Sequence, residues 1–187
     1  MRTDWRETMR DATDVALIGV AATLAALPLV TAGAAVASAS AAIHDRCVEG
    51  SVASGGTQVS RFGRGLLPGL GAALVALGLA ALVILDIRAL VFGAVPGGMP
   101  VLLPTVGAAV ALLGFAGLTV VEVGRRGARG WLVAARSAIG TGLRRPGLLA
   151  ASAGVLALAI ALGVVLPVTA PLLVGYALFA LHAVARR

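Results

Sequence analysis

The sequence predicts an all-α, polytopic transmembrane helix bundle with about six membrane helices. Hydrophobic residues make up 59% of the 187 positions and charged residues only 12%, whereas a soluble domain devotes about a quarter of its residues to charge. The apolar residues form uninterrupted runs of membrane-spanning length. All 15 basic residues are arginine, and they lie between and beside these runs, as the positive-inside rule expects. We interpret residues 1–187 as one integral membrane domain.

Residues 1–14 predict a short amphipathic segment on the membrane surface. Trp5, Met9 and Ala12 share one helical face, and arginines recur every four residues on another. A frayed terminus is the alternative. The acidic residues of this segment do not fit the positive start of a signal peptide, so we expect the first helix to be retained.

Residues 15–46 predict a proline-broken helical hairpin. One helix over residues 15–43 would be roughly 43 Å long, well beyond a hydrocarbon core of about 30 Å. Pro28 breaks the backbone hydrogen bonding there, and we expect Thr31 to cap a second helix. The alternative is one kinked crossing, which would give five membrane helices. The hairpin is preferred because it leaves every arginine cluster, but not Arg88, on the cytoplasmic side together with both termini.

Residues 66–123 predict two further spans, joined by an uncharged loop at 92–104 that is rich in glycine and proline. The second of these spans carries a stripe of small residues that lets another helix approach closely, at Gly107, Ala111, Gly114 and Gly117.

Residues 124–146 predict a basic interfacial segment. Six arginines accompany an apolar face of Leu132, Ala135, Ile139 and Leu143, which suits a helix lying on the cytoplasmic leaflet. Residues 147–187 predict a second proline-broken hairpin, with its turn at residues 167–171.

Several motifs, taken in order, resemble the YesL-like family of small bacterial membrane proteins over nearly the whole chain. They are Leu-Pro-x-Val-Thr-x-Gly-Ala-Ala at 27–35, Arg-Phe-Gly-Arg at 61–64, Ala-Arg-Ser-Ala-Ile at 135–139 and Pro-Leu-Leu-Val-Gly-Tyr-Ala-Leu at 171–178. Genes of that family often stand beside those of sugar-uptake ABC transporters and glycoside-degrading enzymes. The resemblance therefore implies a role in or near carbohydrate utilisation, and it carries over no catalytic residue.

Five polar residues are candidates for function. Asp86 and Arg88 lie near the outer end of a span, where charge is costly unless it reaches water. Glu122 has arginines three and four residues later, which also explains it as a local ion pair. Thr31 and Thr169 follow prolines as helix caps, or else the two turns line a shared cavity for a polar ligand.

No standard motif for catalysis, phosphate binding or metal binding occurs in the sequence. We therefore expect no enzyme, no cofactor, no metal and no nucleic-acid binding. The expected role is a multi-pass protein of the bacterial plasma membrane that is accessory or scaffold to carbohydrate uptake. Its partners would be the lipid bilayer and subunits of a sugar ABC transporter or a second copy of itself. The alternative is a small solute transporter or channel in its own right.

Overall fold

The computed structural model describes residues 5–93 and 98–186, and this part of the chain is helical without a strand. Residues 1–4 of the predicted surface segment, residues 94–97 of the predicted external loop and Arg187 lie outside the described residues. The elements are α1 (Trp5–Ala26), η1 (Leu29–Thr31), α2 (Ala32–Glu49), α3 (Gly55–Val91), α4 (Gly98–Arg125), α5 (Trp131–Arg144), α6 (Pro146–Val165), η2 (Pro167–Thr169) and α7 (Ala170–Val184).

Four stretches of the described chain are long and apolar enough to cross a membrane. They are Gly55–Val91, Pro100–Arg125, Pro146–Val165 and Pro167–Val184. A helical membrane bundle is therefore supported, with four candidate spans among the described residues. The first two helices do not meet the same criterion of length and composition, so the count of about six stays a prediction.

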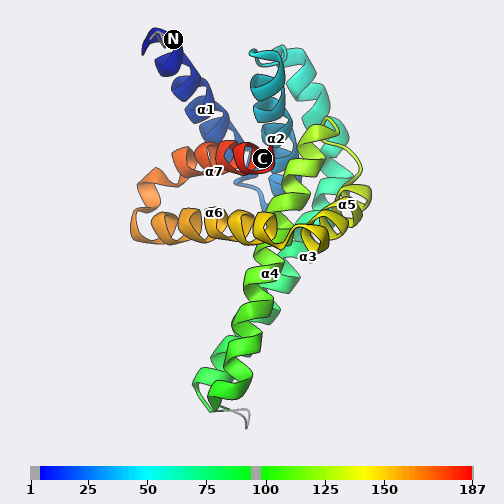
Figure 1. The fold of residues 1–187 in the computed structure, drawn as a ribbon. Helices are drawn as coiled ribbons and strands as arrows, with labels where there is room; N and C mark the ends of the chain where they lie inside the picture. Colours follow the sequence, from blue (N-terminus) through cyan, green and yellow to red (C-terminus); the bar gives the residue numbers. More distant parts are fainter. Residues whose placement is uncertain (1–4, 94–97, 187) are drawn as a thin grey trace.

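The first apolar run forms a hairpin. α1 continues through residues 14 and 15 without a break, ends at Ala26, and is followed by η1 and α2. The guanidinium of Arg46, near the end of α2, forms ion pairs with Asp11 and, at 3.2 Å, with Asp14 of α1. The two ends of the 15–46 segment are thus held together, which is the hairpin geometry and not that of one kinked helix (Figure 1).

α2 forms the core of the bundle. It packs against α1, α3, α4 and α7, and its buried side chains are mainly alanine, as at Ala34, Ala37 and Ala41. A helix that neighbouring helices shield from lipid does not need a lipid-compatible surface. This explains why the most enclosed helix is absent from the candidate spans.

α3 and α4 form a long antiparallel hairpin whose loop-side half extends away from the other helices (Figure 1). Large apolar side chains are exposed along this half, including Leu74 at 60%, Leu85 at 66% and Leu103 at 69%. Such a continuous apolar surface is typical of contact with lipid or with another membrane protein.

α5 is a separate amphipathic helix. Ala134, Ala138 and Gly142 are buried on the side that packs on α4 and α6. Three of the four residues of the predicted apolar face are exposed instead, with Leu132 at 77%, Ile139 at 48% and Leu143 at 73%. The helix therefore presents large apolar side chains outward, as an interfacial helix does.

α6 and α7 form the second hairpin, which runs across α4 and places α7 beside α1 (Figure 1). The contact between α7 and α1 is a glycine crossing, because a Cβ on Gly19 would lie 2.6 Å from the backbone N of Gly175. Only part of the predicted small-residue stripe packs against another helix. Gly114 faces the backbone of Leu149 on α6, whereas no atom would meet a Cβ on Gly107 within 4 Å.

Candidate functional site

Charged side chains from four helices, α1 to α4, meet at one end of the bundle, which we call the basic end. It contains the Arg46 cluster and two further ion pairs, Arg61 with Asp45 at 2.5 Å and Arg125 with Glu122 at 3.0 Å. The pair of Arg125 and Glu122 is the local contact that the sequence suggests. Asp14 of α1 pairs with Arg46 across the hairpin. The other two clusters join residues far apart in the sequence, so no local spacing indicates them.

A buried polar contact lies beneath the basic end. The Ser40 hydroxyl donates to the Val120 carbonyl at 2.7 Å and lies 3.0 Å from Nε2 of His182. Because the hydroxyl has one proton and gives it to Val120, Nε2 of His182 must be the donor in the second bond. The His182 ring centroid lies 5.6 Å from that of His44. This contact joins α2, α4 and α7.

The Ser40 and His182 pair is not built as a nucleophile and its base. A general base must accept the proton of the hydroxyl, but here the imidazole donates to it. Both residues are also buried, at 0% and 2% exposure. His182 is part of the core.

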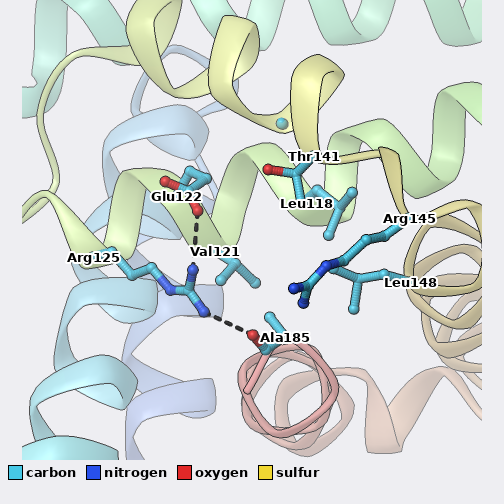
Figure 2. Close-up of a pocket in the computed structure, with 9 residues that line it drawn as sticks. Leu118, Val121, Glu122, Arg125, Thr141, Arg145, Leu148 and Ala185 are labelled. Carbon is cyan, nitrogen blue, oxygen red and sulfur yellow. Dashed lines mark hydrogen bonds and ion pairs between the residues drawn. The ribbon is translucent and has the colours of Figure 1, made fainter. Parts of the chain in front are cut away.

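A cavity of about 100 Å³ lies beside this core, between the ends of α4, α5 and α7 and the start of α6. Figure 2 shows the Arg125 guanidinium held by Glu122 and by the Ala185 carbonyl, the latter at 2.9 Å. The guanidinium of Arg145 points into the same space (Figure 2). The lining residues are Leu118, Val121, Glu122, Arg125, Ala138, Thr141, Arg145, Leu148 and Ala185.

Thr31 and Thr169 do not cap the helices that follow them. Neither forms a side-chain cap hydrogen bond. The Thr31 hydroxyl lies 2.5 Å from the Ala25 carbonyl and 2.7 Å from that of Pro28, and Thr169 bonds back to the Leu166 carbonyl at 2.7 Å. These hydroxyls therefore bond back to carbonyls of the turn or of the preceding helix end, and the Pro28 and Leu166 carbonyls also accept the backbone N–H of the same threonine. The two turns do not contact each other, so they do not line a shared cavity.

We expect Thr31→Val to lower the free energy of unfolding by about 1 kcal/mol, because it removes the hydroxyl that donates to the Ala25 carbonyl at the end of α1. Thr31→Ser should retain the stability of the natural protein, since it keeps the hydroxyl. The midpoint of thermal unfolding in mild detergent measures the difference. Equal midpoints for the valine and serine variants would contradict this role of the hydroxyl.

Asp86 and Arg88 lie apart from the basic end, on the exposed surface near the end of α3. The Arg88 guanidinium lies 5.7 Å from the centroid of the Phe92 ring, and no ion pair joins Asp86 to Arg88 within the described residues. Among those residues, no group of three or more histidine, cysteine or acidic side chains is placed to hold a metal ion. The structure thus brings Glu122 into a polar site and leaves the other four candidates outside it.

Taken together, the fold and the basic end define a helical membrane protein whose polar groups gather at one end of the bundle. Comparison with protein-family models, with curated proteins and with solved structures finds no match to the chain.

Proposed function

We propose that this chain is a multi-pass protein of the bacterial plasma membrane that acts as an accessory or scaffold to carbohydrate uptake. The observation that carries the proposal is the apolar surface on the loop-side half of α3 and α4. Its exposed residues, Leu74, Leu85 and Leu103 among them, are covered by no other helix among the described residues. Such a surface is suited to a membrane-embedded partner, namely subunits of a sugar ABC transporter or a second copy of this protein. The carbohydrate context comes from the resemblance to the YesL-like family.

The interior favours this role over that of a transporter. Most buried residues of α2 are alanine, Gly33 closely approaches the backbone of α3, and the buried hydroxyl of Ser40 is occupied by partners. The cavity of about 100 Å³ is confined to the basic end. A solute path needs polar groups and space at mid-depth, and the described helices offer little of either.

Affinity capture from cells grown on a sugar that induces uptake tests the proposal. We expect the tagged protein, solubilised in mild detergent, to retain transporter subunits or a second copy. Leu85→Arg should abolish the capture, because a charge would enter the apolar surface; Thr57→Arg is the control, since Thr57 is exposed at the basic-end start of α3. Recovery of the protein alone, together with solute flux in vesicles that contain only this chain, would instead make it a transporter.

We further propose six crossings with both termini in the cytoplasm. Two observations support this arrangement: the ends of the first hairpin are held together by Arg46, and the basic end gathers arginines from α2, α3 and α4 together with Arg145, which lies between α5 and α6. The positive-inside rule assigns such an end to the cytoplasm. In this arrangement the turns η1 and η2 face outward, which requires α6 and α7 to turn from the crosswise position against α4 that they have in Figure 1.

Single-cysteine labelling tests the six crossings. Cys47 is the chain's one cysteine, so Cys47→Ala provides a background without thiols. We expect cysteines at Val30, Phe92 and Val168, which are all exposed, to react with a membrane-impermeant maleimide in intact cells. Cysteines at Ser51 and Arg186 should react only after the membrane is opened. If the Phe92 position reacts and the Val30 position does not, the first hairpin fails to cross.

A further inference from the structure

The cavity at the basic end contains donors that no protein group uses. Arg125 is already held by Glu122 and the Ala185 carbonyl. The Arg145 side chain and the Thr141 hydroxyl line the same cavity, and within the described residues neither has a hydrogen bond or an ion pair. Arg145 is exposed and Thr141 is half-buried, so this guanidinium and hydroxyl are free to bind an acceptor that enters the cavity from outside the protein.

The charges of the cavity favour an anion. Two guanidiniums face one carboxylate there, which leaves one positive charge in excess. Arg145 is also the residue that precedes α6, so the positive end of that helix dipole points toward the same place. A phosphate group accepts bidentate bonds from a guanidinium, and the cavity of about 100 Å³ has room for it.

The surroundings of the cavity indicate a membrane lipid as the source of that phosphate. α5 lines one side of the cavity through Ala138 and Thr141 and exposes Leu132, Ile139 and Leu143 on its outer side. A helix of this kind lies at the level of the lipid headgroups. The cavity wall also has an apolar part, at Leu118, Val121 and Leu148. Polar donors beside apolar wall suit a headgroup that remains attached to its glycerol.

We propose that this cavity binds the phosphate of an anionic membrane lipid, through Arg145 and Thr141, and so fixes α5 at the inner leaflet. A free phosphate or a phosphorylated solute is the other source of the same chemistry. The site is independent of the scaffold role, since it does not involve the exposed surface of α3 and α4.

Thermal unfolding of the full chain in a neutral detergent tests the site. The probes are dihexanoyl phosphatidylglycerol, dihexanoyl phosphatidylcholine and inorganic phosphate, each titrated into the natural protein and its variants. We expect saturable stabilisation by phosphatidylglycerol, with an apparent affinity about tenfold weaker in Arg145→Gln because one charge-assisted contact is lost. Thr141→Val should weaken it several-fold. Arg144→Gln is the matched control: it removes the same charge one residue away, from an exposed side chain outside the cavity.

Each result has a defined meaning. Loss of affinity in Arg145→Gln and not in Arg144→Gln supports the site. Stabilisation by inorganic phosphate with the same dependence on Arg145 also supports it, and assigns the phosphate to a soluble source. An equal loss in both variants, equal stabilisation by phosphatidylcholine, or no saturable effect would overturn the proposal, because each would leave only general attraction to a charged surface or no binding at all.

Discussion

Gly69→Ala is expected to separate α2 from α3 and to destabilise the bundle by about 1–3 kcal/mol or more, the range of an overpacked core. A Cβ on Gly69 would lie 2.5 Å from the Ala34 nitrogen and 2.8 Å from the Gly33 carbonyl carbon. These are backbone atoms, which cannot rotate away as a long side chain does. The two helices would have to move apart, and α2 lies at the centre of the bundle.

Gly71→Ala is the matched control. It lies two residues further along α3, and a Cβ there would meet no atom within 4 Å. Because alanine favours a helix more than glycine does, we expect Gly71→Ala to leave the protein as stable as before or slightly more stable. The midpoint of heat- or SDS-induced loss of helicity compares the two. Equal midpoints for both variants would mean that α2 and α3 do not approach closely at Gly69.

The small-residue signal illustrates how far the sequence predicts the packing. The stripe on residues 103–123 does face other helices at Gly114 and Gly117, as its helical spacing suggests. The tight crossings at Gly33 with Gly69 and at Gly19 with Gly175 were not predicted. Glycine and alanine are so frequent in this chain that spacing alone does not identify the partner helix.

The hairpin turns show a similar limit. Pro28 and Pro167 break the helical hydrogen bonding wherever they stand, so the breaks were predictable from residue type. The hydroxyls of Thr31 and Thr169 can either accept a hydrogen bond from a backbone N–H of the helix that follows or donate one to a carbonyl that precedes them. In the structure both bond backward, which the sequence does not decide.

The candidate site was the least predictable part. Glu122 and Arg125 pair over three residues, and helix periodicity reveals such a pair. Asp45 contacts Arg61 and Ser40 contacts His182 only because separate helices converge. For the same reason Arg145 lines one cavity together with Arg125. Side chains that meet in this way leave no periodic signal, so a structure is needed to find them.

Arg61→Leu is expected to be the most destabilising charge removal at the basic end. The Arg61 Nη1 atom lies 2.5 Å from Oδ2 of Asp45, and the two side chains are only 17% and 11% exposed. Without Arg61 the Asp45 carboxylate stays enclosed and unpaired, and breaking one side of a buried pair costs about 3–5 kcal/mol. Replacing both residues with leucine should recover most of that loss, because no buried charge then remains.

A double-mutant cycle on the midpoint of unfolding measures this coupling. Arg64→Leu is the control, since it removes the same charge from α3 at an exposed residue whose Nε bonds to the Ser60 carbonyl and not to an acid. We expect Arg64→Leu to change stability by less than about 0.5 kcal/mol, as is usual at a surface. If the effects of the two single variants, Asp45→Leu and Arg61→Leu, add without coupling, the ion pair contributes nothing to joining α2 and α3. The two helices are then held by the close approach of Gly33 and Gly69 instead.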